Sequence, residues 1–459
     1  MIVSGAAFAF ITWLVVGSRR PIYFVVPYLV CILYFPNASY GLVDSEAAAG
    51  LDNFYNRATG TFFFSAINLL LFGLALQAFI GRRLGALAKA EHNLTGYLWF
   101  FGLFFAGCFA VSFYFDDVRW FNVIGYSGLL NMVNMALGFY VLVMAVQKRE
   151  DLNLVINVFL VCAVTRALFG AVRFVALGGD PANFYANFQG ASVKLTFFDI
   201  NDVFIATVAC FIAAWRALAV DQQPAKRAMY GAIVLLELFI VVFSYRRTGW
   251  LGFGLAALVL AFAMRAKARI WLLAIYGMVG VPAIVFLTLR RVGSAGSGES
   301  ILVKLMPDVF TRGQFSFSSG RFAELYAAWL SIRESPIFGL GTWGQFRSEG
   351  FADVAFHRGN FGWMHSGVLH VWLKAGFVGV VVLLGLFVAY ARFVRVVLPQ
   401  LAPQERGLLL AGVAGSLFYL PTWLIGTPVI EFRTMQLIAF ALALPYLVRA
   451  SASLPSVVR

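Results

Sequence analysis

The chain has 459 residues, of which 61% are hydrophobic, 17% aromatic and 12% charged. Soluble domains have roughly 45–50% apolar and about 25% charged residues, so this composition excludes a water-soluble fold. The formal net charge of +14 does not indicate a nucleic-acid partner, because the basic residues stand in twos and threes at the ends of apolar stretches.

Apolar stretches of membrane-spanning length recur along almost the whole chain. A bilayer core about 30 Å thick is crossed by roughly 20 apolar residues of helix, and a helix satisfies its own backbone hydrogen bonds in lipid. We therefore predict an all-α, polytopic transmembrane helical bundle with about 12–13 spans. The expected spans lie near residues 2–17, 21–36, 61–80, 95–114, 121–146, 153–177, 202–220, 229–245, 248–264, 270–289, 366–391, 407–425 and 434–448.

Charge alternates between successive connections and predicts the orientation. Basic residues follow alternate spans, from Arg19 and Arg20 near the N-terminus to Arg449 near the C-terminus. The positive-inside rule assigns these connections to the cytoplasm. The intervening connections carry acidic residues such as Asp180 and Asp199 and are assigned to the outside. The N-terminus is then outside and the C-terminus inside, although a re-entrant or tilted first segment would change the N-terminal side.

One connection, residues 290–364, is far longer than the rest and is predicted to lie outside. Loops of this length are uncommon unless they are functional or disordered. Within it, apolar residues repeat at helical spacing and predict an amphipathic helix that ends at Pro336. We favour packing of its apolar face on the bundle, with contact to the outer leaflet as the alternative. The apolar residues are Phe322, Leu325, Tyr326, Trp329 and Leu330.

Cysteine and histidine usage gives no sign of a metal centre or a cofactor. Each cysteine falls inside an apolar stretch and is interpreted as a small core residue without a disulfide. No pair of histidines has the spacing of a helical metal site, so no metal is expected. The residues are Cys31, Cys108, Cys162 and Cys210, and His92, His357, His365 and His370.

Several arginines stand where the topology rule predicts few positive charges. Arg246 and Arg247 lie in a tight outer turn, and Arg166 and Arg173 lie seven residues apart on one face of a span. Arg321 belongs to the long outer loop. A guanidinium donates in a planar fork that fits phosphate oxygens, so these arginines are candidates for binding a diphosphate at the head of a lipid.

The alternative interpretation is that some of these arginines are paired inside the protein or extend to lipid headgroups. The acidic residues considered as partners are Asp116, Asp199, Asp202 and Glu431.

His365 stands where the long loop enters the next span, at the boundary between lipid and water. A histidine there can accept a proton near neutral pH and act as a general base, although a lone histidine is more often structural. His370 lies five residues deeper and is expected to pack or hydrogen-bond in the span.

Three motifs stand in order along the chain. They are Ser244-Tyr-Arg-Arg-Thr-Gly-Trp250, then Ser319-Gly-Arg321 continuing to Ser335-Pro-Ile-Phe-Gly-Leu-Gly341, and then His365-Ser-Gly-Val-Leu369 followed by Gly376. Together they resemble the arginine-containing turn, the loop segment and the histidine motif of the bacterial O-antigen ligase and O-antigen (exopolysaccharide) polymerase superfamily. Lys374 departs from the family, in which an acidic or amide residue is common before the final glycine.

The resemblance implies a metal-independent, inverting glycosyltransferase of the bacterial inner membrane with its active site facing the periplasm. Such enzymes transfer a glycan en bloc from undecaprenyl diphosphate to an acceptor hydroxyl, either as a polymerase or as a ligase to the lipid A core, and this choice stays open. The implied partners are the lipid-linked donor, the acceptor glycan or lipid A core, and membrane lipids. The implied catalytic residues are His365, Arg247 and Arg321, with Arg246, Arg166 and Arg173 added for diphosphate binding.

On this interpretation the chain divides into N-terminal spans (1–200), a ligase- and polymerase-like core region (201–391) that includes the loop 290–364, and C-terminal spans (392–459). A transporter or flippase of lipid-linked glycans is the alternative function. We find no convincing internal repeat of the kind such folds often show.

Overall fold

The computed structural model describes residues 2–35, 65–87, 94–115, 129–180, 194–218, 223–263, 320–348, 359–426 and 428–452, with isolated positions between 270 and 286. Most of these residues are helical, and the strands among them are β1 (Phe346–Ser348) and β2 (Gly359–Phe361), which pair antiparallel. The prediction of an all-α helical bundle is confirmed.

The helices of the first half of the chain are α1 (Ile2–Arg19), α2 (Ile22–Tyr34), α4 (Ala66–Arg83), α5 (Leu94–Tyr114), α6 (Leu129–Ala145), α7 (Arg149–Ala176) and α9 (Ile200–Leu218). Those of the second half are α10 (Pro224–Phe243), α11 (Arg247–Ala263), α16 (Gly320–Ile332), α17 (Gly367–Val397), η4 (Leu398–Gln400), α18 (Pro403–Phe418), α19 (Leu420–Ile425), η5 (Pro428–Ile430) and α20 (Phe432–Ser451).

Seven helices among the described residues are long and apolar enough to cross a membrane, and the chain is a multi-pass membrane protein. The first two expected spans form a pair bent by 102°, the geometry of a broken span or a re-entrant segment, and would make an eighth. The sequence predicted more spans for identifiable reasons. Helix α10 carries Lys226, Arg227 and Glu237, α11 has 17 residues, and most of 270–289 lies outside the described residues.

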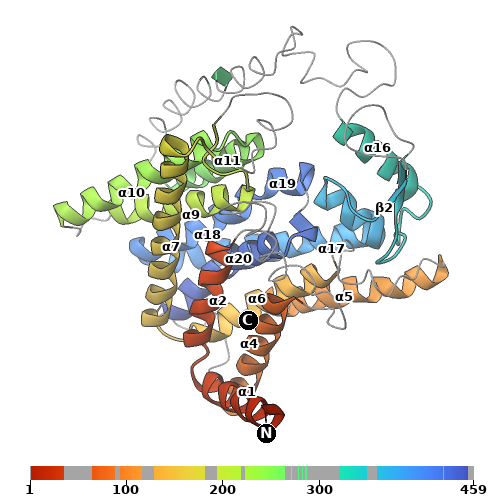
Figure 1. Cartoon of the computed structure of the whole chain (residues 1–459), viewed down its shortest axis with the longest axis horizontal. Helices are drawn as coiled ribbons and strands as arrows, with labels where there is room; N and C mark the ends of the chain where they lie inside the picture. Colours follow the sequence, from red (N-terminus) through yellow and green to blue (C-terminus); the bar gives the residue numbers. More distant parts are fainter. Residues whose placement is uncertain are drawn as a thin grey trace.

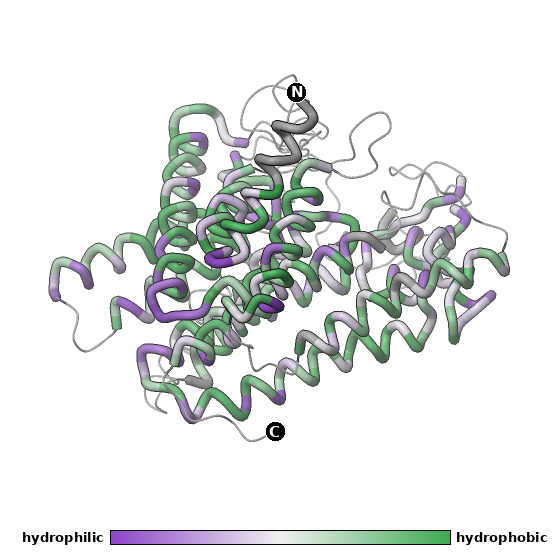
Figure 2. The backbone as a smooth tube through the Cα atoms, turned by 90° about the horizontal axis from the view of Figure 1, so that it is seen from below, coloured by the Kyte–Doolittle hydropathy of each residue, from purple (hydrophilic) through white to green (hydrophobic). Residues whose placement is uncertain are grey.

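The helix ends that the charge rule assigns to one side of the membrane lie together. At the predicted outer end, Arg433 at the start of α20 donates to the carbonyls of Ile32 and Leu33 at the end of α2. At the other end, Arg149 at the start of α7 pairs with Glu405 at the start of α18. In Figure 2 the hydrophilic residues gather at helix ends and turns, as in a membrane bundle.

Helix α20 lies at the centre of the bundle (Figure 1). Every residue from Phe432 to Val448 is buried, because α6 and α18 pack along the helix and α2, α7, α9 and α17 add smaller contacts. A helix that is buried on all sides is apolar all round, as this one mostly is. Its packing joins helices from all three predicted regions of the chain, and the division into those regions stays a prediction.

Helix α17 is interrupted at Gly376, where φ is 67°. We call residues 336–341 the insertion turn, because their backbone enters this interruption. The N–H groups of Leu340 and Gly341 donate to the carbonyls of Leu373 and Lys374, at 2.7 and 3.0 Å. In return, the N–H groups of Phe377 and Val378 donate to Pro336 and Ile337, at 2.9 and 3.2 Å.

Glycines permit this close approach of backbone to backbone. A Cβ atom on Gly376 would lie 2.0 Å from the Ile337 carbonyl oxygen, and one on Gly339 would lie 2.5 Å from the Gly376 nitrogen. Gly341 has the same constraint against Ser112 of α5. The Trp343 N–H also donates to the Ser112 hydroxyl, so the chain after the insertion turn is attached to α5 as well as to α17.

We expect Gly376→Ala to destabilise the protein severely. A side chain at a left-handed φ costs about 1–3 kcal/mol, and the contact with the Ile337 carbonyl adds to this cost. The measurement is thermal unfolding in detergent. Gly231→Ala in α10 is the matched control, since a Cβ there meets nothing within 4 Å. Equal melting temperatures for the two variants would contradict the role of the insertion turn.

Candidate active site

The structure brings His365 and Glu324 together across 41 residues of sequence. His365 lies between β2 and α17, and Glu324 lies in α16. One carboxylate oxygen of Glu324 accepts the backbone N–H of His365 at 3.0 Å, and the other lies 2.8 Å from its Nδ1. The Glu324 side chain is 0% exposed, whereas that of His365 is 24% exposed. The acid is therefore enclosed and the imidazole is partly open.

This pair has the geometry of an oriented general base. A buried carboxylate requires hydrogen-bond donors, and Glu324 receives two from one residue. With the carboxylate ionised, Nδ1 carries a proton, so Nε2 is the nitrogen with the basic lone pair. The ring of Trp363 packs edge-on at 5.3 Å between centroids and further limits the movement of the imidazole.

Glu324 was not among the site residues predicted from the sequence. The signal that was missed is its position on one helical face with Ala327, Ala328 and Ser331, all of which are buried. A carboxylate within a stripe of small buried residues indicates a specific partner rather than solvent.

The predicted amphipathic helix is confirmed as α16, which ends at Ile332, before Pro336. The favoured packing of its large apolar side chains on the bundle is wrong for Tyr326, Trp329 and Leu330, which are exposed. Arg321 lies in the first turn of α16, three residues before Glu324, and its side chain lies outside the described residues. Its role in diphosphate binding stays a prediction.

The arginine turn between α10 and α11 is tightly fixed. Tyr245 adopts a positive φ of 51°, and the Ser244 hydroxyl accepts the Arg246 N–H at 3.3 Å. The Trp250 indole N–H donates back to the carbonyl of Val241 at 3.0 Å. These contacts explain the serine and the tryptophan that flank the two arginines, and they hold the turn rigid.

Arg246 and Arg247 carry charge that no described carboxylate pairs with. The Nε of Arg246 donates to the Phe198 carbonyl, and its guanidinium lies 4.1 Å from the centre of the Phe198 ring. Arg247 is exposed at the first position of α11, where the helix N-terminus adds partial positive charge. The turn therefore presents the exposed charge of Arg247, beside the half-buried Arg246.

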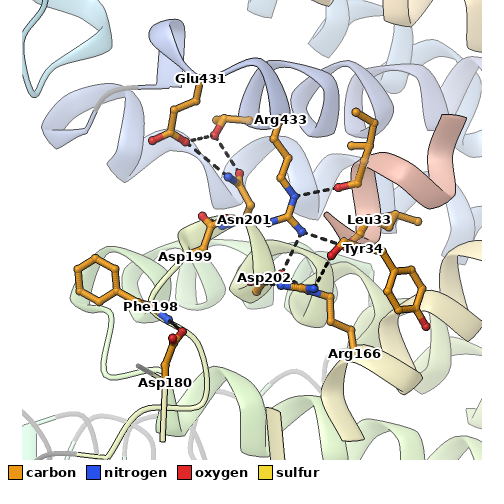
Figure 3. Close-up of polar contacts among 12 residues, drawn as sticks. Leu33, Tyr34, Arg166, Asp180, Phe198, Asp199, Asn201, Asp202, Glu431 and Arg433 are labelled. Atoms are coloured by element: carbon orange, nitrogen blue, oxygen red, sulfur yellow. Dashed lines mark hydrogen bonds and ion pairs between the residues drawn. The ribbon is translucent and has the colours of Figure 1, made fainter. Parts of the chain in front are cut away.

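Arg166 and Arg173 are instead buried and paired, as Figure 3 shows for Arg166. Arg166 makes a two-pronged ion pair with Asp202, with one bond of 2.8 Å, and also donates to the Tyr34 carbonyl. Arg173 pairs with Asp180. The alternative interpretation of internal pairing is confirmed for Arg166 with Asp202. Arg173 has a partner that sequence analysis did not consider.

Arg433 is the centre of the same polar network and was missed from sequence. It is completely buried and donates to Asp199 at 2.7 Å and to Asp202 at 3.0 Å (Figure 3). Its bonds to the last carbonyls of α2 satisfy acceptors that a helix C-terminus leaves unpaired. With Arg166, the network holds two arginines and two aspartates.

Glu431 precedes α20 and lies near the arginine turn. It accepts hydrogen bonds from the Thr434 hydroxyl at 2.6 Å and the Asn201 amide at 3.5 Å. Burial raises the pKa of Glu431 to about 7, with a further contribution from the charge of Asp199, while the charge of Arg246 opposes the rise.

Lys374, which departs from the family pattern, is buried in α17. Its ammonium donates to the carbonyl of Gly344 at 2.5 Å, between the insertion turn and β1. This residue therefore secures the loop that leads to the hairpin.

The arginine turn and the His365–Glu324 pair are joined through α19 rather than by a described contact. Helix α19 packs against both α11 and α17, and Figure 1 shows it between them. Gly252 of α11 lies against Phe418, and Gly367 of α17 lies against Trp423 and Pro428. The two groups therefore occupy the same end of the bundle. Among the described residues, no three of His, Cys, Asp and Glu converge as metal ligands.

Residues 232–384 match a protein family described as O-antigen ligase. The matched segment contains the arginine turn, α16 and His365, so the resemblance to the O-antigen ligase and polymerase superfamily is confirmed. The family indicates glycosyltransferase activity of this general type, with a lipid-linked glycan donor and a glycan or lipid A acceptor. No curated protein matches the chain.

We expect Arg433→Met to prevent stable folding, because it leaves the buried Asp199 without its arginine and removes one of the two arginines that pair with Asp202. Breaking a buried pair of this kind costs about 3–5 kcal/mol. Arg247→Met is the matched control, since that side chain is exposed and makes no described ion pair. Both variants are compared by yield of monodisperse protein and by thermal unfolding. A normal melting temperature for Arg433→Met would show that the network is dispensable.

Proposed function

We propose that the chain is a metal-independent, inverting glycosyltransferase that transfers a glycan en bloc from undecaprenyl diphosphate to an acceptor hydroxyl on the periplasmic face of the inner membrane. The observation that carries this proposal is the His365–Glu324 pair, which supplies an oriented base within the segment that matches the O-antigen ligase family.

In the proposed reaction, Nε2 of His365 accepts the proton of the acceptor hydroxyl as its oxygen attacks the anomeric carbon. The bond between this carbon and the diphosphate oxygen breaks on the opposite face, which inverts the configuration. Glu324 holds the imidazole in position and stabilises the imidazolium that forms, as the third member of a catalytic triad does.

The leaving diphosphate gains negative charge, which arginines stabilise electrostatically. Arg247, Arg246 and Arg321 are assigned this role. The first two form no salt bridge with a described carboxylate, and Arg247 is exposed. Arg166 and Arg173 already bind carboxylates. We therefore assign Arg166 and Arg173 an indirect role. Their ion pairs hold α7 against the segment that carries Phe198, and Phe198 in turn positions the guanidinium of Arg246.

A transporter of lipid-linked glycans would use positive charge in its pathway but has no step that requires an oriented base. The His365–Glu324 geometry therefore favours the enzyme. Deletion of the gene distinguishes its two forms. Core lipid capped with a single repeat would indicate a missing polymerase, whereas uncapped core with long lipid-linked chains would indicate a missing ligase.

We expect His365→Ala to lower glycan transfer by about 10²–10⁴-fold, the usual contribution of a general base, with normal folding. The assay uses purified protein, a lipid-linked glycan donor and an acceptor, and it follows the product by gel shift. Arg247→Ala should also reduce transfer, whereas Arg333→Ala, an exposed arginine just after α16, is the control. Full transfer by His365→Ala would reject the catalytic role.

We expect Glu324→Gln to lower the rate of transfer on the order of 10³–10⁴-fold although it preserves shape and volume. The amide can accept the backbone N–H of His365 with its oxygen, but its NH₂ group then faces Nδ1 and favours the tautomer whose Nε2 carries the proton. The readout is kcat against KM for the acceptor, since loss of a base lowers kcat. An unchanged kcat would show that Glu324 has a purely structural role.

A further inference from the structure

Three large apolar side chains of helix α16 lie on its outer side. The residues that face the protein are mostly small or polar, namely Glu324, Ala327, Ala328 and Ser331, together with Ile332 and the partly buried Leu325. The residues on the outward side are Tyr326, Trp329 and Leu330, which are 38%, 39% and 43% exposed. A helix that faces water has the reverse arrangement, with polar residues outward and large apolar residues inward.

The outward apolar side chains of α16 continue onto the insertion turn and α17. Ile337 and Phe338 are 56% and 64% exposed. The Trp372 ring joins these parts, since it lies 5.5 Å from the Trp329 ring and 5.8 Å from the Phe377 ring, and its N–H donates to the Pro336 carbonyl. We call Tyr326, Trp329, Leu330, Ile337, Phe338 and Phe377 the apron.

The apron is continuous with a surface that faces lipid. Phe377, Val381, Leu384 and Val388 recur at helical spacing along α17 and are about half exposed, at 53%, 48%, 57% and 50%. Helix α17 is long and apolar enough to cross the membrane, so this stripe contacts acyl chains. Because Phe377 belongs to both surfaces, the apron begins where the lipid-facing stripe ends, on the His365 side.

We propose that the apron inserts into the interfacial region of the outer leaflet, so that α16 lies on the membrane as an in-plane anchor. Aromatic side chains are enriched at this depth, where their rings meet both acyl chains and headgroups. A contiguous apolar patch on a protein surface indicates a contact with lipid or protein. Continuity with the stripe of α17 selects phospholipid as the occupant.

The anchor has a consequence for the site. Glu324 lies on the face of α16 opposite the apron and holds His365 by two bonds. The depth at which α16 rests therefore sets the depth of the imidazole relative to lipid headgroups. This inference concerns a surface and does not depend on the proposed glycosyl transfer.

The test places the photoreactive residue p-benzoylphenylalanine at Phe338 and, separately, at Trp329 of the full chain. Each protein is reconstituted in vesicles of phosphatidylethanolamine and phosphatidylglycerol and illuminated, and its adducts are identified by mass spectrometry. Leu384, on the stripe of α17, is the lipid-facing reference. Asn360, an exposed residue of β2 on the hairpin, is the matched control.

Phospholipid adducts at positions 338 and 329, in yields comparable with position 384 and absent at position 360, are the expected result. Crosslinks within the chain instead of lipid adducts would show that another segment covers the apron and would overturn the proposal. Absence of lipid adducts at both positions, with adducts present at 384, would overturn it as well. Two probe positions are used so that a defect in one variant does not decide the outcome.

Discussion

The geometry of the site depends on backbone hydrogen bonds between the insertion turn and the interruption in α17. A helix broken at membrane depth leaves polar backbone groups without partners, and each such group is costly in a medium without water. The turn donates two N–H groups to the carbonyls of Leu373 and Lys374. Its own carbonyls accept the N–H groups of Phe377 and Val378. The break and the turn are therefore stable only together. Helix α16 ends just before the turn and His365 precedes α17, so this junction also fixes Glu324 against His365.

Charge compensation separates the arginines of this chain into two groups. Guanidinium groups buried in a membrane protein require partners, because the cost of removing a charge from water is large. Arg166, Arg173 and Arg433 have carboxylates beside them and stay inside the bundle. Arg246 and Arg247 form no salt bridge with a described carboxylate, although the charge of Arg246 acts on Glu431, and they are half-buried and exposed, respectively. Sequence position alone gave no basis for this division, since Arg166 and Arg247 both stand beside apolar runs.

Local patterns predicted much of the fold and part of the site. The length of the apolar stretches located the helices, and the helical spacing of apolar residues located α16, with Pro336 marking where it stops. The order of the motifs located the arginine turn and His365. The pairing of Glu324 with His365 and of Arg433 with Asp199 was not predictable, because it joins residues 41 and 234 positions apart. The bend between α1 and α2 and the outward orientation of α16 were only alternatives in the sequence analysis, for a different reason. An apolar stripe has the same sequence pattern whether it contacts protein or lipid.

The segment that matches the O-antigen ligase family is about a third of the chain, and the remaining helices explain how its parts are held in one place. The arginine turn and the His365–Glu324 pair belong to this segment, yet they are carried by α11 and α17, which meet through α19 outside it. The guanidinium of Arg246 packs on the ring of Phe198. The Phe198 N–H donates to Asp180, and the next residue, Asp199, is paired with Arg433. Positioning of the reactive groups therefore depends on buried ion pairs in helices that the family match does not include. Substitutions in that network should act on the site through its geometry, while the arginine turn and His365 themselves remain intact in sequence.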